Sequence, residues 1–465
     1  MTLPDTNDTI CALSTPPGTG AIALIRITGK QALEITGTIF HSTNPQFRIS
    51  EASSHSLNHG FILSDNTMID EVLVGIYRAP HSYTGEDVAE ISCHGSEFIQ
   101  ERILRAALEH GCRLARPGEF TLRAFLNRKF DLSQAEAVAD LISATSATSH
   151  ELALHQLRGG FSRKIRDLRQ RLVDFTSLIE LELDFSEEDV EFASRPGLQQ
   201  LLEEMQTDFS ALIRSFSMGN VIKHGIPVAI IGKPNVGKST LLNTLLNEEK
   251  AIVSDIPGTT RDAIEDTIVL EGFRFRFIDT AGLRVSEEQV ESLGIERTRS
   301  KIEEASVILY LFDATLDSYA DVADSLAGLQ SQIREQGKRL ILVGNKTDLL
   351  SELPRGFGEF VEHETVFISA KRKENIHLLA GSLLKTIQEY HISDGAIVTN
   401  TRHLEALQRT LQSVDSALNG LAAGLTSDLL TIDLRQALYH LGTITGEVTT
   451  DEILGNIFGR FCIGK

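Results

Sequence analysis

The sequence predicts a multidomain protein with an N-terminal α+β domain and a helical domain that is interrupted by an inserted α/β domain. Three observations predict this class. The length of 465 residues corresponds to about three domains at roughly 150 residues each. Apolar residues recur at helical spacing on both sides of a central region. That region, about 225–385, instead alternates buried-type strands with helices, as parallel α/β sheets do.

The N-terminal part, 1–121, mixes strands with helix. Segments 22–27 and 72–77 are short and rich in β-forming residues. Turn-forming residues, such as the run 16–20, lie between them. Segment 96–108 has a helical pattern, so we expect an α+β domain here.

Apolar stripes at helical spacing mark the two parts of the helical domain, 122–223 and 386–465. A stripe of this kind must be buried, and the simplest partner is another stripe. Before the central region the stripes are Leu168, Leu172, Phe175, Ile179 and Leu183, then Leu201, Met205, Phe209, Leu212 and Phe216. After it they are Leu404, Leu407, Leu411, Val414 and Leu418, then Leu430, Leu434, Leu438 and Leu441.

The central region, 224–385, is expected to be a parallel α/β domain. Its near-continuous apolar strands are separated by helical patterns. Because the two ends of a domain often lie close together, one domain can be inserted into another. The expected strands are 228–231, 275–278, 307–312, 340–343 and 366–368.

The charge balance limits the kinds of partner. The chain has 44 Lys and Arg against 64 Asp and Glu, which gives a formal net charge of −20. A broad basic surface for nucleic acid is therefore not expected, because phosphate contacts need clustered cations. A local basic patch, or a partner that supplies the charge, remains open.

The four cysteines and the hydropathy indicate the compartment. Cys11, Cys93, Cys112 and Cys462 are widely spaced, so neither a disulfide framework nor a Cys-based zinc site is expected. No apolar run reaches the ~18 residues of a membrane span. The polar start lacks a signal pattern. We expect a reduced, soluble, cytoplasmic protein without a membrane span.

A phosphate-binding motif opens the central region. Residues 232–239 (GKPNVGKS) match G-x-x-x-x-G-K-[ST], follow the strand 228–231 and open a helix. The glycines let backbone N–H groups turn toward phosphates, and the helix N-terminus adds a favourable dipole. Lys238 should reach the β- and γ-phosphates, and Ser239 should bind Mg²⁺.

Three further motifs follow in the order expected of a GTPase. Asp279 and Gly282 (DTAG) stand after a strand, where the Asp can hold Mg²⁺ through water and the Gly N–H can meet the γ-phosphate. In the run 345–348 (NKTD), the Asp348 carboxylate can accept two hydrogen bonds from guanine, a pair that adenine cannot offer. The run 369–371 (SAK) would close the base pocket. The predicted ligand is GTP.

The sequence motifs alone do not identify every side chain that promotes GTP hydrolysis. Thr260, in the run 258–262, is the expected second hydroxyl ligand of Mg²⁺. Leu283 stands where many small GTPases place a water-orienting glutamine, so another group must act. The residues leave four candidates open: Glu287, Glu288, Glu291 and Glu296. Asn235, inside the phosphate loop, could coordinate a monovalent cation.

Four segments, together with these motifs, resemble the MnmE (TrmE) family of bacterial tRNA-modification GTPases. They are 9–18 (TICALSTPPG), 83–87 (YTGED), 115–120 (ARPGEF) and 461–465 (FCIGK). The resemblance spans essentially the whole chain. It implies an N-terminal domain of the tetrahydrofolate-binding kind that drives homodimerisation, and a helical domain assembled from both sides of the GTPase domain.

The resemblance also implies roles for individual residues. Asn235 would be a K⁺ ligand, completed by Ser254, Ile256 and Thr259, and Glu291 would orient the catalytic water. A tetrahydrofolate derivative, of the 5-formyl or 5,10-methylene type, would be held by Arg26, Glu86, Lys129 and Lys465. Cys462 would be a thiol near the reacting carbon, whereas the residues alone also allow a buried structural cysteine.

Two residue sets follow. The catalytic set is Glu291, Lys238, Asn235 and Cys462. The nucleotide-binding set is Asn235, Val236, Gly237, Lys238, Ser239, Thr240, Ser254, Asp255, Ile256, Pro257, Gly258, Thr259, Thr260, Asp279, Thr280, Ala281, Gly282, Asn345, Lys346, Asp348, Ser369, Ala370 and Lys371.

The function that the resemblance implies is a K⁺-stimulated GTP hydrolase. With a flavoprotein partner of the MnmG (GidA) kind, in a heterotetramer or larger complex, it would add a carboxymethylaminomethyl group at C5 of the tRNA wobble uridine. The alternative is a regulatory GTPase switch bound to ribosome or RNA, without a modification role. Since the chain is acidic, we expect it to bind tRNA weakly alone, with local patches near Lys129 and Lys465.

Overall fold

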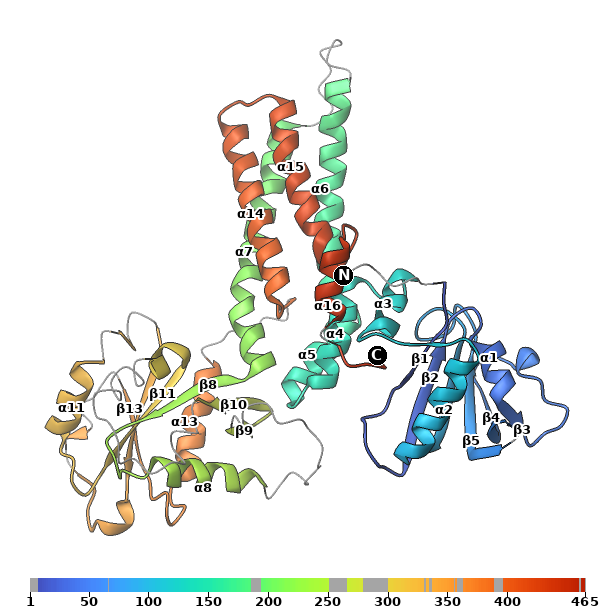
Figure 1. Cartoon of the computed structure of the whole chain (residues 1–465). Helices are drawn as coiled ribbons and strands as arrows, with labels where there is room; N and C mark the ends of the chain where they lie inside the picture. Colours follow the sequence, from blue (N-terminus) through green and yellow to red (C-terminus); the bar gives the residue numbers. More distant parts are fainter. Residues whose placement is uncertain are drawn as a thin grey trace. The chain divides into compact units, whose positions relative to one another are not determined.

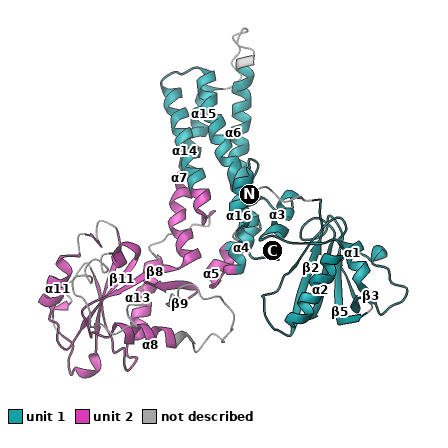
Figure 2. Ribbon diagram, viewed as in Figure 1, with its two compact units in different colours: residues 1–142, 153–209, 405–465 teal, residues 143–152, 210–404 magenta. Residues whose placement is uncertain are grey.

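A computed structural model of the chain forms two compact units (Figures 1 and 2). Unit 1 comprises 1–142, 153–209 and 405–465, and unit 2 comprises 143–152 and 210–404. The residues described are 7–65, 67–184, 194–250, 266–278, 300–329, 332–333, 337–354, 356–357, 363–388, 396–459 and 461–464.

Unit 1 contains a seven-stranded sheet with the order β3-β4-β5-β6-β2-β1-β7. Its pairs are antiparallel except for β1 and β7, which run parallel. The strands are β1 (Ile10–Leu13), β2 (Ile22–Thr28), β3 (Phe40–Ser42), β4 (Ser56–Ser64), β5 (Thr67–Tyr77), β6 (Val88–His94) and β7 (Arg113–Leu114).

Side chains alternate across this sheet. One face is buried, and the other is buried in part, where Ile10 and Ala12 pack with Phe120. Helices α1 (Ala32–Ile39) and α2 (Glu97–Glu109) bury the first face, where Ile25, Val74 and Ile91 meet Ile103. The short helix η1 (Ile49–Glu51) contacts α1. On the second face, strand residues such as Leu57 and Leu73 remain exposed.

Helices make up the rest of unit 1. The predicted stripe residues Leu168, Leu172 and Ile179 are buried on α6, which packs against α15. Helix α16 packs on α3, where a Cβ on Gly118 would lie 2.5 Å from the carbonyl of Phe458. The helices are α3 (Glu119–Leu126), α4 (Leu132–Ser143), α5 (Ala147–Leu157), α6 (Gly160–Asp184), α7 (Arg195–His224), α14 (Thr401–Ala422), α15 (Ser427–Thr445) and α16 (Asp451–Phe458). Parts of α5, α7 and α14, and the last residue of α4, belong to unit 2.

Unit 2 contains a six-stranded sheet with the order β13-β12-β11-β8-β10-β9. The predicted strands are present and parallel, and β9, which the sequence analysis did not include, adds an antiparallel edge. The strands are β8 (Ile226–Ile231), β9 (Asp266–Leu270), β10 (Phe273–Phe277), β11 (Val307–Asp313), β12 (Arg339–Asn345) and β13 (Glu364–Phe367).

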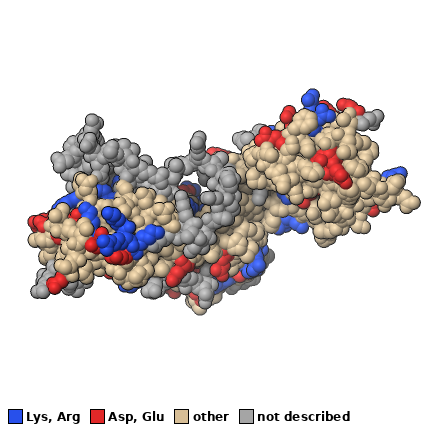
Figure 3. Space-filling view, turned by 90° about the horizontal axis from the view of Figure 1, so that it is seen from below, with Lys and Arg blue, Asp and Glu red and all other residues tan. Residues whose placement is uncertain are grey.

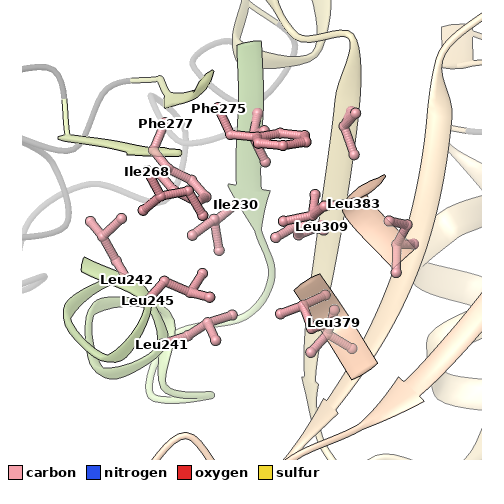
Figure 4. Packing of buried hydrophobic residues seen from close by; sticks show 14 of the residues in the cluster. Ile230, Leu241, Leu242, Leu245, Ile268, Phe275, Phe277, Leu309, Leu379 and Leu383 are labelled. Atoms are coloured by element: carbon pink, nitrogen blue, oxygen red, sulfur yellow. The ribbon is translucent and has the colours of Figure 1, made fainter. Parts of the chain in front are cut away.

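Helices cover both faces of this sheet. Figure 4 shows Leu241 and Leu245 of α8 (Lys238–Lys250) packing toward Ile230 and Phe275, with Leu379 of α13 (Ile376–Gln388) in the same core. Helix α11 (Tyr319–Ala327) covers the opposite face, and η3 (Thr347–Leu349) follows β12. The multidomain α+β, helical and inserted α/β class is confirmed, whereas the four domain bounds stay a prediction. Within the described ranges, no helix is both long and apolar enough to cross a membrane.

Candidate functional site

The loop between β8 and α8 needs glycine at two positions. Gly232 has φ 149°, and a Cβ there would lie 2.1 Å from the carbonyl oxygen of Leu311. Gly237 has φ 101°, and a Cβ there would lie 2.3 Å from Nδ2 of Asn345. Any other residue would therefore push the loop away from the sheet edge. The loop is the predicted phosphate cradle, and its close approach to β11 and β12 keeps it in place.

The N-terminus of α8 and its lysine lie at the same loop. Helix α8 begins at Lys238, so its N-terminal N–H groups and positive dipole end face the loop. The Lys238 ammonium donates to the carbonyls of Gly232 at 3.0 Å and Lys233 at 2.8 Å. Asn235 has φ 62°, a left-handed conformation that asparagine tolerates better than most residues. The loop thus presents a cation and an amide side chain on one short turn.

Asn345 holds the phosphate loop to the second predicted loop. Its Nδ2 donates to the carbonyl of Val236 at 2.8 Å, and its Oδ1 accepts from the Ala370 amide at 3.0 Å. The side chain is buried, with 4% of its surface exposed. Thr244 of α8 donates to the Ala370 carbonyl at 2.8 Å. Three predicted motifs are therefore joined by hydrogen bonds within unit 2.

Asp348 forms the predicted base-reading end of this site. Ser369 donates its hydroxyl to Oδ1 of Asp348 at 2.7 Å, and this bond holds the pKa of the carboxyl below its usual value. Arg372 lies 3.7 Å from Oδ2. The carboxylate is thus ionised at neutral pH and oriented by the serine of the SAK run, as recognition of two guanine donors requires.

One supporting residue was absent from the predicted set. Asp313, at the carboxyl end of β11, pairs with Lys346 at 2.6 Å, and Lys346 has φ 69°. Burial alone would raise the pKa of Asp313, but hydrogen bonds from Lys346 and Thr315 lower it. Asp313 stands at the end of an apolar strand, as the NKTD run does, and this position could have identified it from the sequence.

Some predicted residues lie outside the described ranges. These are Ser254, Asp255, Ile256, Pro257, Gly258, Thr259 and Thr260, then Asp279, Thr280, Ala281, Gly282 and Glu291, and also Lys465. Their roles stay predictions.

The second predicted site lies in unit 1, around the loop that follows β5. Glu86 accepts from the hydroxyl of Thr28 at 3.0 Å and pairs with Arg123 at 3.2 Å. Lys129 donates to the Pro80 carbonyl at 3.1 Å. A Cβ on Gly85 would lie 3.4 Å from Cγ of Lys129, so the loop packs closely on that side chain.

Arg26 faces a different set of partners. It pairs with Glu90 at 2.8 Å, and its guanidinium lies 5.1 Å from the centre of the Tyr83 ring. Burial raises the pKa of Tyr83. Arg26 lies on β2 and contacts Tyr83 of the loop that follows β5, and Glu86 is part of the same loop.

A cavity of about 510 Å³ opens at Glu86. We call it the Glu86 cavity, and its lining includes Lys30, Asp87, Arg123 and Asn127. The size suits a small organic ligand, which typically needs roughly 300–1,000 Å³. Carboxylate, amide and cationic groups are available in its walls.

Sequence reasoning missed the buried charge cluster behind Glu86. Arg123 is fully buried and pairs with Asp8, Glu86 and Glu119. Arg113 also pairs with Glu119, at 2.6 Å. Burial alone would raise the pKa of Glu119, but hydrogen bonds from Arg113 and from a backbone amide lower it. The quoted ARPGEF run contained Glu119, although nothing in the sequence revealed its partners.

The C-terminal segment lies against the first strand region. Ser14 donates to the carbonyl of Gly464 at 3.2 Å, and a Cβ on Gly464 would lie 2.2 Å from the carbonyl oxygen of Leu13. Cys462 is exposed, so the alternative of a buried structural cysteine is wrong, because its side chain is not part of a core. The terminal motif and the TPPG run are therefore neighbours.

The glycine loop, the lysine at a helix start and the oriented carboxylate of the base loop define the class of P-loop GTP-binding proteins. The family model described as the MnmE helical domain matches residues 132–462, and that of the GTP-binding protein TrmE N-terminus matches 9–129. The tRNA modification GTPase MnmE of Bacteroides fragilis (strain ATCC 25285) is 51% identical, covering 98% of this chain and 99% of that protein. The chain belongs to the MnmE family.

Two further similarities complete the comparison. The tRNA modification GTPase MnmE of Cytophaga hutchinsonii is 50% identical over 465 residues, which cover 100% of this chain and 99% of that protein. The FeoB G-domain of Methanococcus jannaschii is 25% identical with a TM-score of 0.25, covering 35% of this chain and 98% of that one.

Proposed function

We propose that the chain is a K⁺-stimulated GTP hydrolase that adds a carboxymethylaminomethyl group at C5 of the tRNA wobble uridine, together with a flavoprotein partner. One observation carries the GTP part. The Asn345 bridge joins the phosphate loop to the Asp348 base loop within one domain. Membership of a family named for tRNA modification supports the tRNA part. No specific observation favours the alternative of a regulatory switch.

The residues of the phosphate loop have complementary roles in this proposal. Lys238 and the α8 N-terminus bind the β- and γ-phosphates, and Ser239 holds Mg²⁺ together with Thr260. The amide oxygen of Asn235 suits a K⁺ ion beside the phosphates, with Ser254, Ile256 and Thr259 as the other ligands. Such an ion would offset negative charge that develops during hydrolysis. Glu291 orients the attacking water, since Leu283 cannot.

The Glu86 cavity is the proposed site of a tetrahydrofolate derivative, of the 5-formyl or 5,10-methylene type, which supplies a one-carbon unit when bound. The cavity fits such a group, because a carboxylate, Glu86, can accept from the aminopyrimidine edge. Nε of Arg123 is buried and has no hydrogen-bond partner among the described residues. Arg26, Lys129 and Lys465 provide cations for a glutamate tail, and Cys462 is the proposed thiol nearby.

We propose that the protein is a homodimer through the N-terminal sheet. Residues of its second face include Ile22 and Leu57, each 67% exposed, and Leu73, 41% exposed. A sheet face with large apolar side chains in water favours association with a matching surface. A second copy offers the same face by two-fold symmetry.

The flavoprotein partner, of the MnmG (GidA) kind, is proposed to form a heterotetramer or larger complex and to supply much of the tRNA-binding charge. The net charge of −20 supports this division. On the face drawn in Figure 3, basic side chains gather only in small groups among acidic ones. We propose a cytoplasmic location, where tRNA is used, and the domain bounds 1–121, 122–223, 224–385 and 386–465.

A reconstituted assay tests this function. Purified chain, GTP, the folate as one-carbon donor, glycine as donor of the carboxymethylamino part, the flavin with a reduced nicotinamide, and tRNA would be incubated with the flavoprotein added or omitted, followed by nucleoside analysis. We expect the modified wobble uridine only when both proteins and GTP are present. Modification by the flavoprotein alone, or no modification with every component present, would contradict the proposal.

A further inference from the structure

Unit 1 contains a second cavity, of about 760 Å³, in whose wall the proposed function uses Lys129 but none of the residues named below. We call it the α3–α15 cavity. Its walls include Phe125, Phe130, Arg128, Arg166 and Thr445. Leu126, at the end of α3, lines both this cavity and the Glu86 cavity, so the two adjoin.

Cations outnumber the available acids around this cavity. Arg128 is exposed, and its side chain has no partner among the described residues. Arg166 is 48% exposed and pairs with Asp131 at 2.8 Å. Asp131 also accepts from two serine hydroxyls, and the other acid of the lining, Glu447, is paired with Arg169 at 2.6 Å. An anionic group in the cavity could therefore bind guanidinium groups whose charge is not fully neutralised by neighbouring carboxylates.

A buried hydroxyl in the wall lacks a partner. Thr445, the last residue of α15, is 3% exposed, and its Oγ1 makes no hydrogen bond to any described residue. A buried hydroxyl without a hydrogen-bond partner is unfavourable, and a ligand with a polar edge would satisfy it. This observation is independent of the charges and also points to a ligand.

Aromatic side chains narrow the chemical class of that ligand. Phe125 and Phe130 are partly buried and line the same cavity as the arginines. Aromatic rings beside cations bind unstacked nucleotides, because a base stacks on the ring while its phosphate meets the cation. Inorganic phosphate or a carboxylate would use the arginines and leave the rings unused. The volume is also within the range of small-ligand sites.

We propose that the α3–α15 cavity binds one unstacked nucleotide of the tRNA substrate, the wobble uridine. This inference rests on the proposed function. Arg128 and Arg166 contact its phosphates, Phe125 or Phe130 stacks on the base, and Thr445 bonds to a polar edge. The shared wall at Leu126 brings the base next to the Glu86 cavity. A small basic patch with aromatic rings is compatible with a chain whose net charge is −20.

A cross-linking experiment locates the base. An anticodon stem–loop with 5-iodouridine at the wobble position is irradiated with the full chain and its flavoprotein partner, and the linked peptide is sequenced by mass spectrometry. We expect the link within residues 125–134. A link confined to other segments of this chain, or to the flavoprotein, overturns the inference.

Binding measurements with matched variants test the cations. The double variant Arg128→Asn, Arg166→Gln removes two charges, and asparagine suits the φ of 58° at position 128. We expect stem–loop affinity to fall roughly tenfold or more, and the slope of log K against log salt to decrease by about 1.4, since each single-strand phosphate contact contributes about 0.7. The control Arg105→Gln, Arg163→Gln removes two exposed arginines elsewhere in unit 1 and should bind as wild type. Equal affinity of the cavity variant and the control overturns the inference.

A conservative variant and two readouts separate the remaining outcomes. Thr445→Val keeps the shape of the side chain, and we expect it to weaken stem–loop binding several-fold without loss of thermal stability. If the arginine variant loses folate affinity while RNA binding is unchanged, the cavity belongs to the folate site and the inference is wrong. If the wild-type protein and its partner do not modify tRNA, the proposed function is wrong. If the wild type and the cavity variants modify tRNA equally, only this inference is wrong.

Discussion

We propose that single residues determine which nucleotide unit 2 accepts. Asp348 is oriented by the Ser369 hydroxyl at 2.7 Å, and its lowered pKa keeps it ionised at neutral pH. A carboxylate can accept both guanine donors at once, and it would be left unpaired by adenine. Behind it, Asn345 transmits the position of the base loop to the phosphate loop through two hydrogen bonds.

The Asp348→Asn variant tests this specificity. Its amide can accept one guanine donor but places its own N–H groups against the other. Because the variant loses a charge-assisted hydrogen bond to the base, GTP affinity should fall roughly ten- to hundredfold. Xanthine carries a carbonyl instead of the exocyclic amine, so XTP should gain affinity. Fluorescent GTP and XTP titrations measure both, with the exposed Asp324→Asn as control; unchanged GTP affinity would refute the role.

Substitution of Glu119 tests how much the buried charge cluster of unit 1 stabilises the fold. Glu119→Gln leaves the fully buried Arg123 with one fewer anionic partner, so we expect a destabilisation of roughly 2–3 kcal/mol at pH 7. The matched change at the exposed pair, Glu109→Gln, should alter stability by about 0.5 kcal/mol or less. Calorimetry of the full chain measures both.

The pH dependence of that difference follows from the lowered pKa of Glu119. A carboxyl whose folded pKa is depressed stabilises the protein fully above its ordinary value, near 4.5, and the stabilisation is lost as pH falls through the lower folded pKa. The wild type should therefore keep its advantage over Glu119→Gln from pH 7 to about pH 5. A difference that vanished within that range would show that Glu119 is not held ionised.

At the scale of elements, the sequence predicted the helices and strands whose signals lie within one short run of residues. The β8–loop–α8 unit was predicted because the glycines, the lysine and the apolar strand are consecutive. Strand β9 was missed, because an edge strand is only partly buried and lacks a continuous apolar run. The pairing of Arg123 with Asp8 joins positions 115 residues apart, and no spacing rule connects them.

The exposed face of the N-terminal sheet is the element through which we propose that the protein dimerises. The double variant Leu57→Asp, Leu73→Asp places charges at the centre of the proposed interface, where desolvation is unfavourable. We expect a dimer for the wild type and a monomer for the variant by light scattering. Leu349→Asp, which alters an exposed leucine of unit 2, should stay dimeric. A monomeric wild type, or a dimeric double variant, would contradict this interface.

At the scale of the whole molecule, the proposal assigns GTP turnover and one-carbon chemistry to different units of the chain. The phosphate loop and base loop lie in unit 2, whereas the Glu86 cavity lies in unit 1. Hydrolysis in this proposal therefore drives association of the GTPase domains and not bond formation on tRNA. In this proposal, the acidic chain relies on a partner and on small basic patches for RNA binding.

Potassium dependence tests that view of turnover. Steady-state GTPase rates in KCl should exceed those in NaCl by roughly tenfold or more, because a fixed cation beside the phosphates stabilises developing charge. Asn235→Gly removes the amide and suits the φ of 62°, and it should abolish the difference between the two salts. Equal wild-type rates in the two salts would eliminate the K⁺ mechanism.

Nucleoside analysis of tRNA from a strain that lacks this gene tests the central claim most directly. We expect the wobble uridine to lose its C5 modification in that strain. The wild-type gene should restore it, and the Asp348→Asn variant should restore much less. A deletion strain with fully modified wobble uridine would contradict the proposed function.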